Sequence, residues 1–385
     1  MSLQPSTATP SQAESKHKAS STMATDPVHE AAEIVESILP AKLEDITANW
    51  LTLVLGYQTR TVEVTKVVHG TASKIFVTVV YDDTSSTSRT EFLCIKGGFD
   101  PNIQALYSWI VNVYFREVEF FNRVAPKLSH ISLPRSRWAG HNGVNQGIVI
   151  MDDLNAQGYQ FGDPAKAWPV SRVLAGVEQL AALHAGTWNA RAEDYPWLTA
   201  HYDQAILSLM ETYEAVVLSD DRPSGIHDYL KDQKRMTAVL KKHWQSRNPK
   251  FQCMVHGDPH TGNTYLVQDQ PRFLDWQIIH IGSAFHDVAY FMGGALSIED
   301  RRAHEMEILD HYLEALGTFG GPAFSSSQKD VLDEYRKSFL AGIGWIMCPY
   351  VMQPKEQVQA MAVRYAMALD DHKTIELVES LTDVE

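Results

Sequence analysis

The chain contains little cysteine: its three cysteines, Cys94, Cys253 and Cys348, lie far apart in 385 residues. An odd number of widely spaced cysteines favours neither a disulfide framework nor a zinc knuckle, and a reducing compartment fits best. The chain also lacks an apolar run long enough to span a bilayer, and its first residues lack the apolar core of a signal peptide. We therefore expect a cytoplasmic protein with no membrane partner.

Positive charge is also scarce. The chain has 33 Lys and Arg residues against 47 Asp and Glu residues, which gives a formal net charge of -14. This balance disfavours broad binding to nucleic acids or anionic membranes, because both require clustered basic side chains. It is compatible with a cationic or neutral small molecule, so we expect a small-molecule partner and no nucleic acid.

A length of 385 residues favours two coupled lobes over one compact unit. Residues 1–26 are rich in Ser and Thr and are predicted to form a disordered tail. Residues 28–39 predict a first helix. Thr47 is a suitable N-cap for a second helix, which stops at Gly56.

Beyond Gly56 the pattern changes to short runs rich in Val, Ile, Thr and Phe, which predict an antiparallel sheet. One helix is expected across residues 105–124, and helical spacing dominates after Asp152, interrupted by a hairpin after residue 263. We therefore predict an α+β fold with an N-terminal lobe at 27–153 and a larger, mainly helical lobe at 154–385.

The stretch HGDPHTGN contains His256, Asp258 and Asn263. This spacing is typical of the catalytic loop of protein kinases, where the Asp accepts the proton of the substrate hydroxyl and the Asn holds Mg²⁺. Phosphoryl transfer needs both, because the nucleophile must be oriented and the developing charge neutralised. We interpret His256 as a residue that orients the loop through hydrogen bonds.

Asp275 ends the second strand of the predicted hairpin, in RFLDWQ. An antiparallel return would carry it back beside the 256–263 loop. Its carboxylate and the Asn263 amide are the hard oxygen ligands that Mg²⁺ prefers. Trp276 and Gln277 follow, so the Asp-Phe-Gly form of protein kinases is absent.

Lys96 ends the apolar strand EFLCIK, and two acidic residues on the next helix, Glu117 and Glu119, could pair with it. Helical projection at about 100° per residue places Glu117 inside the apolar arc and Glu119 on the solvent side. A carboxylate on a buried face needs a cationic partner. We therefore predict that Glu117 pairs with Lys96.

Taken together, HGDPHTGN and FLDWQ resemble the motifs of the aminoglycoside phosphotransferase and choline kinase superfamily, most closely its ecdysteroid-kinase-like branch. The segments CIK, REVEFF, IVIMDDL, ALHAGTW and HDVAYFM agree with that resemblance. It implies a protein-kinase-like bilobal fold and transfer of phosphate from ATP, with Mg²⁺, to a small alcohol. Choline, an aminoglycoside, a sugar, a steroid and a secondary metabolite all remain open as acceptors, as does the oligomeric state.

The resemblance also implies residue roles. Asp258 would be the base, Asn263 and Asp275 the metal ligands, and Lys96 with Glu117 the phosphate-binding pair. The backbone from Asp152 to Leu154 would receive the adenine. The loop HGTASKIF, which includes Gly70 and Ser73, replaces the usual glycine-rich loop and could hold phosphate through its N–H groups.

Two other hypotheses stand beside the kinase. His256, Asp258 and His260 are close in sequence, and imidazole nitrogens suit Zn²⁺, so a metal-dependent hydrolase is one alternative. A non-catalytic pseudokinase is the other. His184 is interpreted as a packed core histidine, and Asp287 as a carboxylate that starts a helix or braces a loop.

Overall fold

The computed structural model describes residues 39–82, 89–106, 109–198, 202–219, 221–222 and 225–382. The expected tail at 1–26, and all but the last residue of the helix expected at 28–39, lie outside these ranges. None of the helices within them is long and apolar enough to cross a bilayer.

The first helix of the structure, α2 (Ala48–Leu55), has the predicted bounds. Thr47 Oγ1 accepts a hydrogen bond from the Trp50 amide at 3.2 Å, which satisfies one of the free N–H groups of the first turn. Gly56 ends the helix with φ 73°, a left-handed conformation that glycine adopts at little cost.

The smaller lobe is built on the predicted antiparallel sheet, in which five strands follow the order β1-β2-β3-β5-β4. The strands are β1 (Thr59–Val68), β2 (Ser73–Tyr81), β3 (Arg89–Gly97), β4 (Ser136–His141) and β5 (Gly147–Asp152). Because side chains alternate along a strand, Ile75 and Ile95 point into the core beneath α2, while Lys74 and Lys96 share the opposite face.

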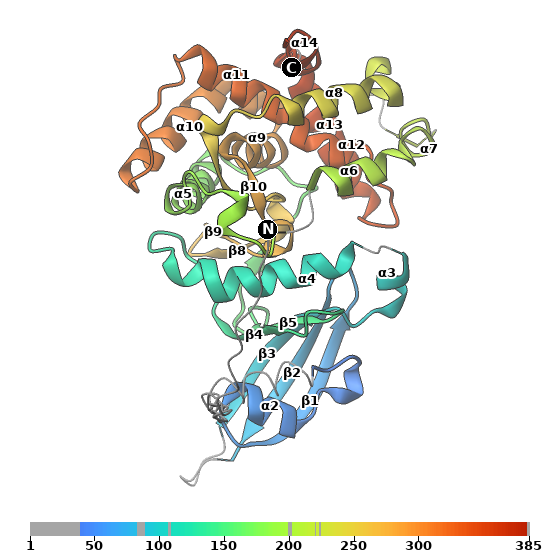
Figure 1. Ribbon diagram of the computed structural model, residues 1–385, viewed down its shortest axis with the longest axis vertical. Coiled ribbons are helices and arrows are strands. Elements are labelled where there is room, and N and C mark those ends of the chain that lie inside the picture. Colours follow the sequence, from blue (N-terminus) through green and yellow to red (C-terminus); the bar gives the residue numbers. More distant parts are fainter. Residues whose placement is uncertain are drawn as a thin grey trace, which may run out of the picture.

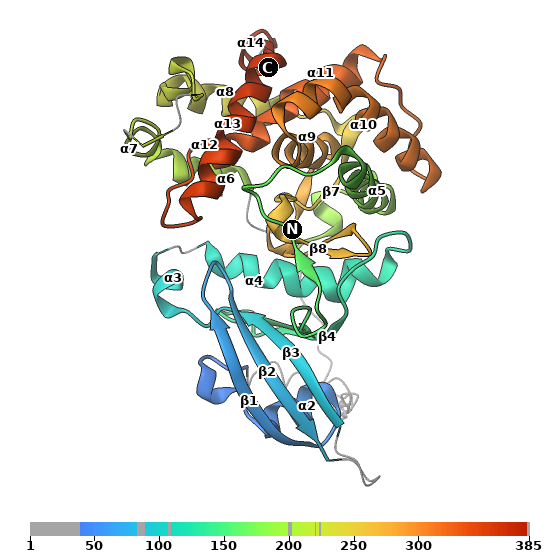
Figure 2. The same ribbon diagram turned by 180° about the vertical axis from the view of Figure 1, so that it is seen from behind.

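The single helix expected at 105–124 is wrong in its bounds. The structure has a short α3 (Pro101–Leu106), then α4 (Ile110–Glu119), which continues as a π-helical turn, η2 (Phe120–Val124). Figures 1 and 2 show α4 lying between the sheet and the helical lobe. This helix is therefore the part of the smaller lobe that faces the larger lobe.

The larger lobe is mainly helical, as predicted, so the α+β bilobal fold is confirmed. Its helices are α5 (Val170–Gly186), α6 (Tyr202–Met210), α7 (Tyr213–Val217), α8 (Gln233–Gln245), α9 (Ala284–Ala295), α10 (Ile298–Thr318), α11 (Lys329–Ser338), α12 (Ile343–Ile346), α13 (Lys355–Asp371) and α14 (Thr374–Glu379). Helix α9 runs through the middle of the lobe, and nearly all of its side chains are buried (Figure 1).

Short strands and turns of this lobe carry the motifs. They are β6 (Gln160–Phe161), β7 (Gln252–Val255), β8 (Thr264–Val267), β9 (Gln270–Phe273) and β10 (His280–Ser283). The 3-10 turns of this lobe are η4 (Ala192–Asp194), η5 (Asp228–Lys231), η6 (Pro249–Phe251), η7 (Thr261–Asn263), η8 (Trp276–Ile278) and η9 (Phe339–Gly342). Two further 3-10 turns, η1 (Leu43–Asp45) and η3 (Ala125–Lys127), belong to the smaller lobe.

Strands β8 and β9 form the predicted hairpin. Gln268 and Asp269 make its two-residue turn with positive φ values of 51° and 66°, the backbone sign that suits the twist of a tight hairpin. The return strand ends at Phe273, two residues before Asp275. The Leu274 amide then donates to the Asn263 carbonyl at 2.8 Å, so the hairpin places Asp275 next to the 256–263 loop.

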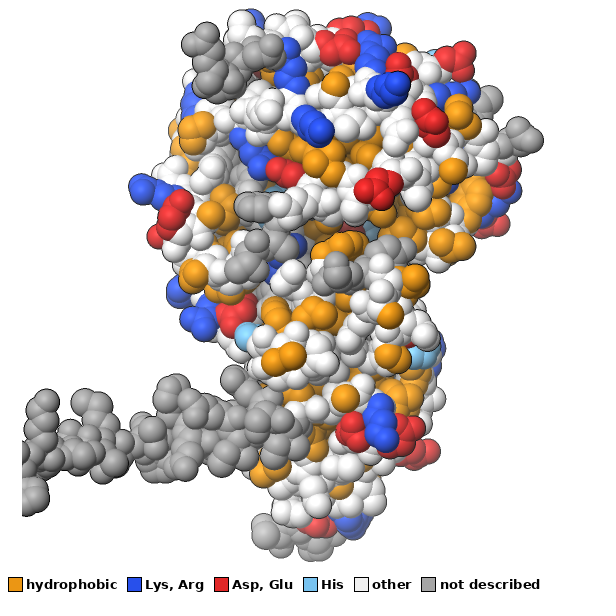
Figure 3. Space-filling view, turned by 45° about the vertical axis from the view of Figure 1, so that its right-hand side comes forward, with side chains coloured by type: hydrophobic (Ala, Val, Ile, Leu, Met, Phe, Trp, Pro, Cys, Tyr) orange, Lys and Arg blue, Asp and Glu red, His pale blue; other side chains and the backbone are white. Residues whose placement is uncertain are grey.

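On the face shown in Figure 3, basic and acidic side chains are interspersed over both lobes. The described residues on this face form no continuous basic patch, in agreement with the negative net charge.

We expect the contact between Trp276 and Phe120 to be a major contribution to stability. Trp276 is fully buried, and its ring stacks on Phe120 with centroids 4.2 Å apart and an interplanar angle of 8°. Trp276→Ala should lower the free energy of unfolding by about 3–5 kcal/mol, because it leaves a large cavity. In urea denaturation, Phe92→Ala, at a side chain that is 53% exposed, should cost less than about 1 kcal/mol. Equal losses in the two variants would contradict this assignment.

Candidate active site

An ion-pair cluster joins the two lobes. Lys96 Nζ lies 2.7 Å from Glu117 Oε2 on α4 and 2.7 Å from Asp275 Oδ1, and its side chain is only 3% exposed. Burial alone would lower the pKa of Lys96, but the two carboxylates raise it to about 12. Burial would raise the pKa of Asp275, but Lys96 and Lys74 lower it to about 2. Lys96 and Asp275 are therefore charged at neutral pH, whereas burial raises the pKa of Glu117 above its ordinary value.

The predicted choice of Glu117 over Glu119 agrees with this geometry. Besides pairing with Lys96, Glu117 Oε1 accepts a hydrogen bond from the Trp276 amide at 3.1 Å. The prediction that Glu119 faces solvent is wrong. Glu119 is buried and pairs with His141 and Arg123, because strand β4 covers that side of the helix.

Both ring nitrogens of His256 bind backbone groups, one just after the β8–β9 hairpin and one within the 256–263 loop. Nε2 donates to the Leu274 carbonyl at 2.8 Å, and Nδ1 accepts from the Asp258 amide at 3.3 Å. Burial lowers the pKa of His256, which favours the neutral form that these two bonds require. These two bonds are compatible with the expected role of His256, which is to orient the loop through hydrogen bonds.

Asp287, near the start of α9, holds the first residues of the 256–263 loop. Its carboxylate accepts hydrogen bonds from the amides of His256 at 2.6 Å and Gly257 at 2.9 Å. It also lies 3.1 Å from His184 Nε2, and His184 Nδ1 in turn lies 2.9 Å from the Tyr312 hydroxyl. Burial would raise the pKa of Asp287, but its histidine neighbours lower it to about 2. The ionised carboxylate thus holds the first residues of the loop in place.

Asp258 is held by residues on both sides. Tyr290 donates its hydroxyl proton to Oδ1 at 2.5 Å, and Asn263 Nδ2 lies 3.2 Å from Oδ2. The Tyr290 hydroxyl accepts a hydrogen bond from Trp345 Nε1 at 2.7 Å, so a short relay runs from α12 through α9 to the loop. Burial raises the pKa of Asp258 to about 7.

The residues expected to hold Mg²⁺ present suitable oxygen atoms. Asn263 uses Nδ2 in its bonds to the Asp258 carbonyl at 2.9 Å and to the Asp258 carboxylate, and neither bond uses Oδ1. Asp275 and Asn263 line the same polar cleft. A carboxylate and an amide oxygen on one cleft wall form a donor set that fits Mg²⁺.

Two cavities meet at Asp258. The polar cleft has a volume of about 370 Å³ and is lined by Gly70, Thr71, Lys74, Asn263 and Asp275, among others. The apolar cavity has a volume of about 420 Å³, and its walls include Trp109, Val113, Ile206, Leu209, Ile278 and Trp345. The residues common to both are Thr71, Asp258, His260, Gln277, Met352 and Gln353.

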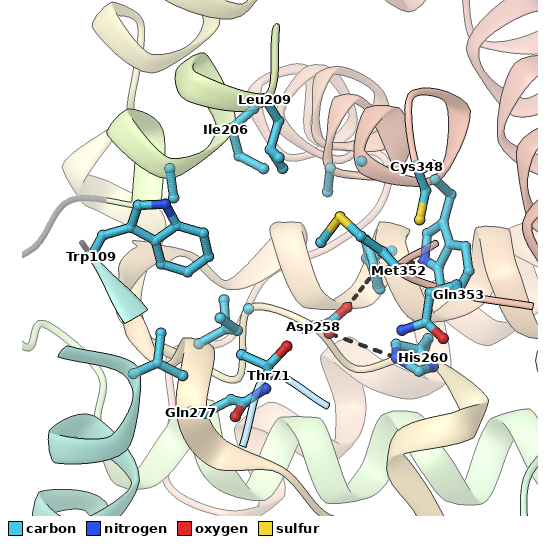
Figure 4. Close-up of a pocket in the computed structure, with 18 of the residues that line it drawn as sticks. Thr71, Trp109, Ile206, Leu209, Asp258, His260, Gln277, Cys348, Met352 and Gln353 are labelled. Carbon is cyan, nitrogen blue, oxygen red and sulfur yellow. Dashed lines mark hydrogen bonds and ion pairs between the residues drawn. The ribbon is translucent and has the colours of Figure 1, made fainter. Parts of the chain in front are cut away.

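Figure 4 shows how the apolar cavity surrounds this junction. Asp258 projects between Trp109 on one side and His260 on the other, with Ile206 and Leu209 on the opposite wall. A molecule in either cavity would therefore meet the same carboxylate.

The remaining predicted nucleotide residues lie around the sheet. Gly70 lines the polar cleft, whereas Ser73 is buried with its hydroxyl 3.1 Å from His69 Nδ1. The Asp152 side chain accepts from Arg137 Nε at 2.5 Å. The Leu154 amide has no backbone acceptor within the described ranges, whereas the carbonyl of Leu154 accepts from the Tyr159 amide at 3.1 Å.

Sequence reasoning missed four residues of the site: Lys74, Gln277, Tyr290 and Trp345. Tyr290 lies three positions after Asp287, on the same face of a helix, so helical spacing could have found it. Lys74 pairs directly across from Lys96 in the β2–β3 register. Trp345 approaches from a distant helix, and its sequence carries no pattern that indicates the contact.

The geometry disfavours a zinc site at His256, Asp258 and His260. Both nitrogens of His256 are occupied by backbone groups, and His260 Nδ1 accepts from the Gly262 amide at 3.1 Å. Across the part of the chain that the structure describes, no three His, Cys, Asp or Glu side chains form a group that could hold a metal ion.

Comparison with known proteins assigns the chain a family. Residues 70–319 match the profile of the ecdysteroid kinase-like family. An uncharacterized kinase-like protein of Caenorhabditis elegans is 24% identical over 261 residues. That match covers 64% of this chain and 66% of the worm protein, just under two thirds of its length.

Two solved structures are among those similar to this chain. A choline kinase from Cryptosporidium parvum Iowa II is 13% identical with a TM-score of 0.49, and the match covers 91% of this chain and 96% of the other. A choline kinase from Streptococcus pneumoniae is 12% identical with a TM-score of 0.46, and the match covers 82% and 93%.

The brace at Asp287 generates a prediction about stability. Its pKa of about 2 in the folded state lies below the ordinary value of 3.8, so its stabilising contribution is complete above pH 4 and is lost as the pH falls through about 2. Asp287→Asn should lower the free energy of unfolding at neutral pH by about 2–5 kcal/mol, because a buried N–H would face an NH₂ group.

Urea unfolding at pH ~7 and at pH ~3 checks this prediction, since the deficit of the variant should shrink at the lower pH. Asp228→Asn, at a side chain that is 98% exposed, is the control and should leave the free energy of unfolding nearly unchanged. A deficit that stayed constant with pH would argue against an ionised brace.

Proposed function

Because the chain belongs to the ecdysteroid kinase-like family, we propose that it is a phosphotransferase that moves the γ-phosphate of ATP to a hydroxyl group of a small molecule. The observation that carries this proposal is the position of Asp258 at the junction of a polar cleft and an apolar cavity. Phosphoryl transfer needs this arrangement, since the donor and the acceptor must meet in line at one base.

The polar cleft is the proposed site of the nucleotide phosphates. Lys96, held by Glu117, supplies positive charge beside it, and the backbone near Gly70 supplies N–H groups. Asn263 Oδ1 and the Asp275 carboxylate would hold Mg²⁺ there. A bound Mg²⁺ neutralises charge on the phosphates and in the transition state. We propose that adenine lies against the backbone from Asp152 to Leu154.

Asp258 is the proposed base. It accepts the proton of the acceptor hydroxyl as the oxygen of that group bonds to the γ-phosphorus. The bond between the γ-phosphorus and the bridging oxygen breaks, and ADP leaves. Tyr290 binds Oδ1 and Asn263 binds Oδ2, and together they fix the orientation of the carboxylate at the junction.

The apolar cavity is the proposed acceptor site, and its chemistry narrows the acceptor class. Its volume of about 420 Å³ lies in the range of small-molecule sites. Asp258 is the one carboxylate among the described lining residues, and Arg116 is a buried cation whose pKa, lowered by burial to about 10, keeps it charged at neutral pH. A polycationic aminoglycoside is therefore disfavoured, and a neutral, largely apolar alcohol is favoured.

Gln277 adds a polar group to the proposed acceptor site. Its Oε1 is buried and has no hydrogen-bond partner among the described residues, and its side chain lines both cavities. A buried amide oxygen without a partner is costly unless a ligand satisfies it. An acceptor with a second O–H or N–H group near the reacting hydroxyl would meet this need.

The two lobes share the work in this proposal. Residues 27–153 are proposed to bind the nucleotide, and residues 154–385 to supply the catalytic loop and most of the acceptor cavity. Thr71 and Trp109 of the first segment also line that cavity, so the acceptor site depends on both lobes.

The direct test is incubation of the purified protein with ATP, Mg²⁺ and a metabolite extract. We expect mass spectrometry to show a compound that gains one phosphoryl group. Asp258→Asn should reduce turnover by about 10²-fold or more, because the base is lost, while nucleotide affinity measured by calorimetry stays nearly unchanged. Asp310→Asn, an exposed carboxylate in α10, is the matched control. Full activity of the Asp258 variant would end the proposal for the base. If the native protein phosphorylated no compound in the extract, a pseudokinase would be favoured.

The hydroxyl of Tyr290 generates a second prediction. Tyr290→Phe should reduce kcat by about tenfold with little change in KM for ATP, because Asp258 loses a hydrogen bond that orients it. Tyr365→Phe is the matched control, since its buried hydroxyl donates to the Tyr290 carbonyl at 2.5 Å and does not reach the carboxylate. Steady-state kinetics with the acceptor found in the extract compares the two variants, and equal losses would reduce Tyr290 to a structural role.

A further inference from the structure

Lys74 occupies an unusual position in the sheet. It is the second residue of strand β2, close to the 69–72 loop, and its Cα partner in the antiparallel register is Lys96 on β3. Side chains directly opposite each other on neighbouring strands lie close together, and two like charges there are destabilising. A second lysine at this position therefore calls for a negative partner.

Asp275 is the negative partner in the structure, but it lies closer to Lys96 than to Lys74. Lys96 is almost completely enclosed and lies 2.7 Å from Asp275 Oδ1, with Glu117 on its other side. Lys74 lies 3.7 Å from Asp275 Oδ2 and keeps 44% of its side chain exposed. Lys74 is therefore a loosely held cation, whereas Lys96 is a fixed one.

The exposed part of Lys74 faces the polar cleft. It lines that cleft together with Asp258, Asn263 and Asp275, and it is the one lysine or arginine among the described lining residues. Lys96 does not line it, because the carboxylates around it shield its ammonium group. A polyanion that enters the cleft would therefore meet the charge of Lys74 first.

We propose that Lys74 binds the terminal phosphate of the nucleotide, an inference that rests on the function proposed above. The terminal phosphate must reach Asp258 for transfer, and Lys74 shares the cleft wall with Asp258, whereas Lys96 lies deeper between Glu117 and Asp275. The ammonium group of lysine is a compact charge on a flexible stem, which suits contact with a group that moves during the reaction.

The same residue has a second task before the nucleotide binds. In the structure Lys74 helps to neutralise Asp275, the carboxylate proposed to hold the metal ion. A metal ion at Asp275 would replace that positive charge and leave Lys74 available for phosphate. The lysine thus exchanges one anionic partner for another.

The test compares two nucleotides that differ in the terminal phosphate. Isothermal titration calorimetry with AMP-PNP and with ADP, each with Mg²⁺, gives the affinities of the full-length protein and its variants. Lys74→Met should weaken AMP-PNP binding by about tenfold, the usual effect of losing a charged hydrogen bond, and ADP binding by less than about threefold. Lys74→Arg should retain most of the AMP-PNP affinity, since it keeps the charge.

Two controls separate the possible failures. Lys66→Met removes an exposed charge from the neighbouring strand β1, away from the cleft, and should leave both affinities unchanged. Thermal unfolding confirms that each variant is folded. If Lys74→Met lost equal affinity for the two nucleotides, or lost affinity for neither, the proposed role of Lys74 would be overturned and the proposed function would stand. Failure of the native protein to bind either nucleotide would overturn the proposed function and this inference with it.

Discussion

The whole site depends on the placement of one ammonium group between two carboxylates. Lys96 comes from the sheet, Glu117 from α4 and Asp275 from the hairpin of the larger lobe, and both ion pairs are 2.7 Å long. A lysine that is 3% exposed would be strongly destabilising without such partners. Because its partners come from two lobes, this cluster fixes the position of the hairpin relative to the sheet, and hence the shape of the polar cleft.

Helix α9 organises the other half of the site. Its first turn supplies Asp287, which holds the amides at the start of the 256–263 loop, and its next turn supplies Tyr290, which holds the Asp258 carboxylate. Because a buried helix is rigid, its contacts fix the position of the 256–263 loop. In the smaller lobe, the π-helical turn after α4 places Phe120 against Trp276.

The sequence predicts those features that depend on local pattern. Strand alternation, the cap at Thr47 and the motif around Asp258 all follow from residues near one another in the chain. Helical projection correctly selects Glu117, since one face of that helix must be buried, but it cannot show that strand β4 covers the opposite side at Glu119. Contacts such as the one from Trp345 to the loop join segments that no periodicity relates, and only the folded structure contains them.

We propose that a nucleotide in the polar cleft meets an acceptor at Asp258. A crystal structure of the protein with AMP-PNP and Mg²⁺ is the decisive experiment. We expect the terminal phosphate to lie in the polar cleft facing Asp258, with the metal ion bound by Asn263 and Asp275. A nucleotide bound outside the space between the lobes, or a metal ion that neither residue touches, would contradict it.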